Sequence, residues 1–188
     1  MRWDKLHKEA IMLVKQGISE SNIGYQTTIN TSKEKLWEVI ATPGILESCH
    51  PFCQENKVIK WGEVGAEDTI QYYNGLKLHR LFTEWNIGEG YELLIGRGKY
   101  ATAKVLWEIT SKEDEVSALS ISIIIYPDIA LRRYSKSLRW VFTKFYLLPS
   151  MSKYVKDVVK GFQYYIETGQ AVRKNQFGNN RMFSNKEA

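Results

Sequence analysis

The middle of the chain carries a succession of strand patterns with no helical pattern between them. We predict strands where β-branched and aromatic residues recur, over residues 55–61, 68–73, 76–86, 91–95, 99–110 and 116–126. Asn74-Gly75, between two of these strands, is the dipeptide that most strongly favours a tight hairpin turn. Because parallel strands need long crossover connections, these short connections predict an antiparallel meander.

Alternation within the last two strands predicts which face of the sheet is buried. Apolar and polar residues alternate along residues 101–110, and residues 119–125 repeat the pattern. Successive side chains of a strand point to opposite faces, so the apolar residues are expected to share one inward face. Ala101 and Ala103 are small on this otherwise bulky face, and we expect them to leave space beneath it.

Helical patterns precede the predicted sheet. Residues 1–20 have the apolar spacing of an amphipathic helix. After a short strand over residues 25–29, Thr31 is expected to cap a helix, with Glu34 reaching back to complete a capping box. Pro43-Gly44 is expected to separate this helix from a second short helical turn.

Two helical segments follow the strands, over residues 129–148 and 151–168. Pro149 is expected to separate them, because proline cannot continue a helix without losing a hydrogen bond. An apolar stripe marks the second segment as the long C-terminal helix: Val155, Val158, Val159, Phe162 and Ile166. Gly169 is expected to end it, and residues 170–188 to form a polar tail with Phe177, Met182 and Phe183 as candidate anchors.

One stretch carries a resemblance to a known group of proteins. Residues 30–52, NTSKEKLWEVIATPGILESCHPF, place a capped helix, a Pro-Gly break and an aromatic-rich turn after one strand. This order resembles the START-like superfamily, also called the SRPBCC or polyketide cyclase/dehydrase group. The resemblance implies an α+β helix-grip fold over residues 21–169, in which a curved antiparallel sheet wraps a long C-terminal helix around a cavity. The helices over residues 1–20 and 129–148 would be additions to that fold.

The resemblance and the small side chains at Ala101 and Ala103 together predict an internal ligand cavity. Ligand pockets are mostly apolar, with a few polar groups that orient the ligand. The candidate ligand-binding residues lie on or beside the middle strands and on the C-terminal helix: Tyr72, His79, Trp85, Arg97, Tyr100, Ala101, Ala103, Val105, Trp107, Val155, Val159 and Phe162. The alternative is a filled core, in which aromatic neighbours occupy the space and the polar groups face water.

These residues favour noncatalytic binding, transport or sensing of a lipid or other hydrophobic small molecule. A polyketide aromatase or cyclase-like enzyme, in which polar cavity groups assist proton transfer, is the main alternative. A membrane-associated interaction module, which would work through a basic aromatic helix and not through the cavity, is a third. The sequence lacks the GxSxG and P-loop motifs. His79 and Glu84 lie five residues apart on one predicted strand and are expected to point to opposite faces, which disfavours a catalytic pair.

Neither a metal nor another cofactor is predicted. Cys49, His50 and Cys53 bring two thiols and an imidazole together, but a zinc site ordinarily needs a fourth ligand. The two other histidines, His7 and His79, are distant in the sequence. We therefore expect this segment to have a role in the hydrophobic core or at the opening of the cavity.

Positive charge is concentrated late in the chain. The net charge is +5, and residues 128–160 alone contain eight basic and two acidic residues. Within them, a basic segment rich in aromatic residues has the composition of a helix that lies on anionic lipid, with Arg132, Arg133, Arg139 and Trp140 as candidate membrane-surface residues. The favoured alternative is a helix packed on the core with a solvated basic face. Nucleic acid is not a predicted partner, because no helix-turn-helix, zinc-finger or RNA-binding motif accompanies the charge.

Length and cysteine content bound the remaining possibilities. A chain of 188 residues suits one domain that needs no disulfide or metal to fold. It contains two cysteines, no apolar core of signal-peptide length and no run long enough to span a membrane. We therefore expect a cytoplasmic protein, peripheral to a membrane if the basic segment binds lipid.

Overall fold

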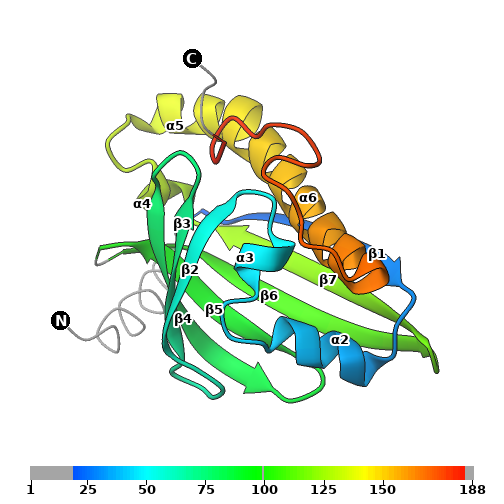
Figure 1. Cartoon of the computed structure of the whole chain (residues 1–188). Helices are drawn as coiled ribbons and strands as arrows, with labels where there is room; N and C mark the ends of the chain where they lie inside the picture. Colours follow the sequence, from blue (N-terminus) through cyan, green and yellow to red (C-terminus); the bar gives the residue numbers. More distant parts are fainter. Residues whose placement is uncertain (1–18, 99, 185–188) are drawn as a thin grey trace.

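A single seven-stranded antiparallel sheet forms most of the molecule (Figure 1). The structure is a computed structural model that describes residues 19–98 and 100–184, so nearly all of the predicted helix over residues 1–20 lies outside it. The strand order is β1-β7-β6-β5-β4-β3-β2. The strands are β1 (Ser21–Ile29), β2 (Cys53–Lys60), β3 (Glu67–Tyr72), β4 (Lys77–Asn86), β5 (Gly90–Arg97), β6 (Tyr100–Glu113) and β7 (Val116–Ile125). The predicted meander is confirmed, and the first strand completes the sheet by pairing with the last.

The long helix α6 (Leu148–Thr168) lies across the concave face of this sheet (Figure 1). Four residues of its predicted apolar stripe are buried, with no exposed surface at Val155, Val159 and Phe162, and the fifth, Ile166, is partly buried. Gly161 brings the helix against α3 (Leu46–Cys49), because a Cβ atom at this position would lie 2.0 Å from the carbonyl oxygen of Cys49. Gly169 ends the helix with a left-handed φ of 69°, as the sequence predicted.

The helix α2 (Lys33–Ile40) begins one residue later than predicted. Ser32, not Thr31, is its N-cap, and the Ser32 hydroxyl accepts a hydrogen bond from the amide of Lys35 at 3.3 Å. Glu34 then stands second in the helix instead of third, so the predicted capping box does not form. Pro43-Gly44 does separate α2 from the short helix α3.

Two bulges change the face to which predicted residues belong. In the β5–β6 pairing, Ile95 lies opposite Ala103 and Gly96 opposite Ala101, so Thr102 is an extra residue. The bulge reverses the alternation, and Ala101 packs with Leu94 apart from the main core. The prediction that Ala101 faces inward is therefore wrong.

The second bulge lies on β4. Phe82 pairs with Leu93 and Glu84 with Glu92, which leaves Thr83 as the extra residue and puts Glu84 on the same face as His79. The prediction that His79 and Glu84 point to opposite faces is wrong. Five strand residues still separate them by roughly 16 Å, too far for a catalytic pair.

The helices before α6 differ most from the prediction. The helix expected over residues 129–148 is interrupted, and its parts are α4 (Pro127–Ala130), α5 (Lys136–Phe142) and the π-helical turn η1 (Thr143–Leu147). The chain then continues without a break into α6, and Pro149 occupies the first turn of that helix. Proline lacks an amide proton, and the irregular hydrogen bonding of the π-helical turn directly before it accommodates the missing bond. The predicted break at Pro149 is wrong.

The segment after α6 runs back along the domain as far as the structure describes it. The amide of Val172 donates to the carbonyl oxygen of Ser48 at 2.8 Å, and the amide of Asn175 donates to that of Pro51 at 2.9 Å. Phe183 is 4% exposed and packs in the main core. Residues 170–184 therefore contribute to the interior, although their composition is mostly polar.

Candidate functional site

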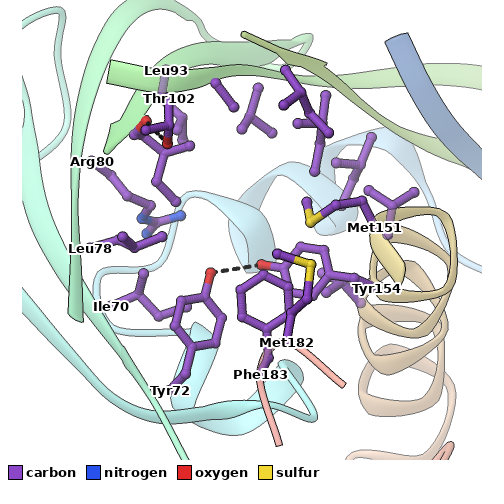
Figure 2. Close-up of a pocket in the computed structure, with 18 of the residues that line it drawn as sticks. Ile70, Tyr72, Leu78, Arg80, Leu93, Thr102, Met151, Tyr154, Met182 and Phe183 are labelled. Atoms are coloured by element: carbon purple, nitrogen blue, oxygen red, sulfur yellow. Dashed lines mark hydrogen bonds between the residues drawn. The ribbon is translucent and has the colours of Figure 1, made fainter. Parts of the chain in front are cut away.

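An internal cavity of about 290 Å³ lies between the sheet, α6 and the C-terminal segment (Figure 2). Its walls are almost entirely apolar and come from β3 to β7, from α6 and from the segment that contains Met182 and Phe183. The volume is close to the lower end of the range for small-molecule sites, roughly 300–1,000 Å³. The cavity is therefore suited to one compact ligand.

Five of the predicted ligand-binding residues line the cavity: Tyr72, Ala103, Val105, Trp107 and Val155. The bulky neighbours Ile95 and Ile125 pair with Ala103 across the sheet and also line the space. The small side chain of Ala103 thus stands between larger ones at the wall, as the alternation along β6 predicted.

Three other candidates lie in the hydrophobic core or pack against it, outside the cavity lining. Phe162 packs its ring edge to face on Trp107, with 5.0 Å between ring centroids, and Val159 is fully buried on the same helix. Trp85 belongs to an aromatic cluster at the other end of the sheet, where it stacks on Tyr91 at 5.5 Å. These residues support the wall or the core without lining the cavity.

The remaining four candidates lie away from the cavity. His79 is half-buried on the outer face of β4, and Arg97 is exposed at the end of β5. The Cζ atom of Arg132 lies 4.0 Å from the ring centroid of Tyr100. Ala101 is on the outer face, as described above. Of these four, only Ala101 was placed by regular alternation, which the bulge at Thr102 interrupts.

A buried ion pair that the sequence did not single out lies at the polar end of the cavity. Arg80 on β4 is opposite Asp68 on β3, and only Arg80 lines the cavity. The Asp68 carboxylate accepts hydrogen bonds from Nε of Arg80 at 2.7 Å, from Nη2 of Arg80, and from Nδ2 of Asn56 at 3.0 Å. Burial lowers the pKa of Arg80, but the Asp68 carboxylate more than offsets this and the net pKa is raised. Arg80 therefore remains charged inside the protein.

Three uncharged polar side chains form a chain of hydrogen bonds beside this pair. Tyr154 on α6 contacts Nε2 of His50 at 2.9 Å, and its hydroxyl lies 3.0 Å from that of Tyr72 (Figure 2). Burial and the nearby charge of Arg80 lower the pKa of His50 to about 3. Burial raises the pKa of Tyr154 to about 12 and raises that of Tyr72 well above its usual value. All three groups are neutral near pH 7.

The cysteines beside this network are buried thiols. Burial raises the pKa of Cys53 to about 12 and that of Cys49 further, so neither is a thiolate at neutral pH. Over residues 19–98 and 100–184, no three His, Cys, Asp or Glu side chains are grouped as metal ligands would be. The cavity thus offers a ligand apolar contacts and a small number of hydrogen bonds.

The helix α5 differs from the favoured interpretation of the basic segment. We expected it to pack on the core, but none of its residues is buried. Leu138, Trp140 and Phe145 are 58%, 60% and 68% exposed. In the described part of the chain, no helix is long and apolar enough to cross a membrane.

The four candidate membrane-surface residues have different environments. Arg133 and Trp140 are exposed, and Nζ of Lys144 lies 5.2 Å from the Trp140 ring centroid. Arg132 is exposed but rests on the ring of Tyr100. Arg139 is half-buried and pairs with Asp128 at 2.8 Å, so it holds α5 against α4 instead of facing outward.

Comparison with known proteins shows the fold. No protein-family model and no curated protein sequence matches the chain. Norcoclaurine synthase from Thalictrum flavum, solved with dopamine and hydroxybenzaldehyde, is similar over 85% of this chain and 94% of its own, with a TM-score of 0.58 and 11% identity. The chain has the helix-grip fold.

Two bacterial structures show the same likeness. Aha1 from Colwellia psychrerythraea matches 79% of this chain and 98% of its own, with a TM-score of 0.58 and 12% identity. A protein of unknown function from Staphylococcus aureus matches 82% of this chain and 98% of its own, with a TM-score of 0.61 and 14% identity. The START-like resemblance of residues 30–52 is thus confirmed as a resemblance of fold.

Proposed function

We propose that the protein binds one apolar small molecule in its internal cavity. The apolar cavity between the sheet and α6 carries this proposal. The structural likeness to norcoclaurine synthase, whose structure holds dopamine and hydroxybenzaldehyde, supports it, because the same fold there accommodates small aromatic molecules. Binding, transport and sensing all require this site.

The energetic cost of an empty cavity also supports a ligand. Unfilled apolar space in a core destabilises a protein by about 24 cal/mol per Å³. For a cavity of about 290 Å³, this is on the order of 7 kcal/mol. A typical domain has a net stability of only about 5–15 kcal/mol, so a ligand that fills the space would stabilise the fold substantially.

The protonation states favour binding over an aromatase or cyclase-like reaction. A general acid or base works best when its pKa lies near the operating pH. The pKa of His50 is lowered to about 3 and that of Tyr154 is raised to about 12, so neither exchanges protons readily near pH 7. Turnover of a bound polyketone would contradict this preference.

The proposal is tested by filling the cavity. Binding of the neutral fluorescent probe N-phenyl-1-naphthylamine is measured for the wild-type protein, for Ala103→Trp, and for the surface control Ile87→Trp. The wild-type protein and the control should bind one probe each, and folded Ala103→Trp should bind at least about tenfold more weakly, because the indole occupies the ligand's space. Unchanged binding by folded Ala103→Trp would contradict the proposal.

We also propose that α5 docks on an anionic membrane surface. Leu138, Val141 and Phe145 are exposed along α5 and η1 at the spacing of one helical face, and the exposed Tyr134 lies just before α5. The exposed cations Arg133, Lys136 and Lys144 flank this apolar stripe and complement a negative lipid surface. Each basic residue near such a surface contributes about 1 kcal/mol of attraction.

The position of α5 relates this surface to the cavity. Ala130, at the end of α4, and Leu147, at the end of η1, both line the cavity, and α5 lies between them in the chain. A membrane that contacts α5 would thus lie close to one wall of the ligand site. This arrangement suits exchange of an apolar ligand with a bilayer.

Co-sedimentation with vesicles tests the docking surface. The wild-type protein should pellet with phosphatidylcholine vesicles that contain phosphatidylserine, and less with phosphatidylcholine alone or in high salt, because salt screens the attraction. Leu138→Ser/Phe145→Ser should remain in the supernatant, and the control Ile59→Ser/Ile87→Ser, which changes two other exposed apolar residues, should pellet normally. Equal pelleting of the two double variants would contradict docking through α5.

A further inference from the structure

The tautomer of His50 beside the cavity is set by a backbone hydrogen bond. Nδ1 of His50 accepts a hydrogen bond from the amide of Phe52 at 3.1 Å, so this nitrogen carries a lone pair and no proton. His50 is 3% exposed and its pKa is lowered to about 3, so the ring is neutral near pH 7. The single ring proton is therefore on Nε2.

This tautomer fixes the next hydrogen bond and favours one direction for the last. Nε2 of His50 donates to the hydroxyl oxygen of Tyr154 at 2.9 Å. Either hydroxyl can donate across the 3.0 Å between Tyr154 and Tyr72. Donation by Tyr154 is favoured, because a hydroxyl that accepts a bond from His50 becomes a stronger donor in a cooperative chain. In this favoured direction Tyr72 accepts the bond, and its own proton then has no acceptor among the residues that the structure describes. Tyr72 is 1% exposed and lines the cavity, so a buried hydroxyl donor faces the ligand space.

Arg80 adds positive charge to the same wall. Its Nε and Nη2 bind Asp68, and within residues 19–98 and 100–184 its Nη1 makes no hydrogen bond. Figure 2 shows Tyr72 and Arg80 on the sheet side of the cavity, opposite Tyr154 and Met151. Arg80 is near enough to Tyr72 for its charge to act on that phenol. An unpaired buried donor destabilises a protein, so this end of the cavity favours a hydrogen-bond acceptor.

We propose that the ligand has an apolar body with one neutral oxygen acceptor, such as a ketone or ester carbonyl, that accepts a hydrogen bond from the Tyr72 hydroxyl beside Arg80. This inference rests on the proposed function, because it assigns the chemistry of a ligand in the same cavity. The acceptor is neutral because Asp68 already balances the charge of Arg80. A ligand carboxylate here would be a buried anion without a counter-charge, which is strongly unfavourable.

Three naphthalenes of nearly equal size test this inference. They are 2-acetylnaphthalene, which has a ketone, 2-ethylnaphthalene, which has no acceptor, and 2-naphthoate, which is an anion. Isothermal titration calorimetry at neutral pH compares their dissociation constants for the wild-type protein, Tyr72→Phe and the matched control Tyr154→Phe. Each substitution removes one hydroxyl group from the same aromatic cluster, but in the favoured direction of the bond only Tyr72 has the unpaired proton.

Tyr72→Phe should weaken 2-acetylnaphthalene about fivefold to tenfold, which is typical of one hydrogen bond, without weakening 2-ethylnaphthalene. Tyr154→Phe should change the two affinities by the same factor, and 2-naphthoate should bind at least about tenfold more weakly than the ketone. The carbonyl stretch of bound 2-acetylnaphthalene should lie at lower frequency in the wild-type protein than in Tyr72→Phe, which reports the hydrogen bond independently of affinity.

The possible failures are distinguishable. If Tyr72→Phe changes the ketone and the hydrocarbon equally, or if 2-naphthoate binds most tightly, the inference about the acceptor is wrong and the cavity remains a ligand site. If none of the three compounds binds the wild-type protein, the proposed function is contradicted together with the inference.

Discussion

Replacement of Ala103 by leucine distinguishes a real cavity from a filled core through the sign of the stability change. Ala103 is 7% exposed and lines the cavity between Ile95 and Ile125. The substitution adds three carbons, and burial of each stabilises by about 0.8 kcal/mol, or about 2.4 kcal/mol in total. Ordering the leucine side chain opposes this by about 0.5–1 kcal/mol. Ligand-free Ala103→Leu should therefore be about 1.5 kcal/mol more stable than the ligand-free wild-type protein.

Urea unfolding of both proteins after extraction of any ligand measures this difference. Extra carbons in a core without free space destabilise it by about 1–3 kcal/mol. Ala66 is fully buried and does not line the cavity, so Ala66→Leu is the matched control and should be destabilised by that amount. If Ala103→Leu is destabilised as much as Ala66→Leu, the space beside β6 is already filled and the argument for the cavity is refuted.

Three further predictions concern the surroundings of the site. Gly161→Ala should lower the free energy of unfolding by at least about 2 kcal/mol in urea unfolding, because its Cβ would lie 2.0 Å from the carbonyl oxygen of Cys49. Asp68→Ala should destabilise the protein by about 3–5 kcal/mol in the same assay, because it leaves the charge of Arg80 buried without a partner. His50 titrates at about pH 3 when folded and near its usual 6.5 when unfolded, so between these values the unfolded state binds the additional proton. As the pH falls through this range, His50 should therefore lower stability by up to about 1.4 kcal/mol per pH unit, which is measured as the difference between wild type and His50→Gln.

Controls and contrary results for these predictions come from nearby positions. Ser152→Ala on the exposed side of α6 should be nearly neutral, and an equally neutral Gly161→Ala would contradict the close approach of α6 to α3. Glu55→Ala breaks an exposed ion pair with Lys77 and should change stability by less than about 1 kcal/mol. A loss as small for Asp68→Ala would show that its pair is not buried. An unchanged pH dependence in His50→Gln would show that His50 is not desolvated.

Most of the sheet was predictable because its signals are local. Alternation and the Asn74-Gly75 turn located every strand of the meander to within about three residues, since both depend only on neighbours in the sequence. The same alternation placed Ala103, Val105 and Trp107 at the cavity wall. These three residues follow the bulge at Thr102, in the part of β6 where the alternation holds without interruption.

The polar end of the site depends on register, which local patterns do not specify. A two-residue turn centred on Asn74-Gly75 would place Asp68 opposite Leu81, but the observed pairing places it opposite Arg80. A shift of one residue in the turn therefore decides whether the ion pair forms. A detectable signal did exist. Asp68 lies two residues before Ile70, and Arg80 two residues after Leu78, so each charged residue shares the inward face of its strand with an apolar one.

Long-range contacts account for the other corrections. His50, Tyr72 and Tyr154 come from three separate elements and meet only when α6 crosses the sheet. The bulge at Thr102 reverses the side of Ala101, and no residue type near it requires an extra residue there. The exposure of α5 was not predicted either. The position of Pro149 alone did not indicate that α6 begins at Leu148.

Native mass spectrometry of the purified protein tests ligand binding in the cavity most directly. Wild-type protein should carry one apolar small molecule, identifiable after denaturing extraction, or should take up one equivalent of 2-acetylnaphthalene when supplied. Ala103→Trp should do neither while remaining folded, because its indole fills the space beside β6. A wild-type protein that carries no adduct and takes up no apolar compound, or a folded Ala103→Trp that binds as the wild type does, would contradict the central claim.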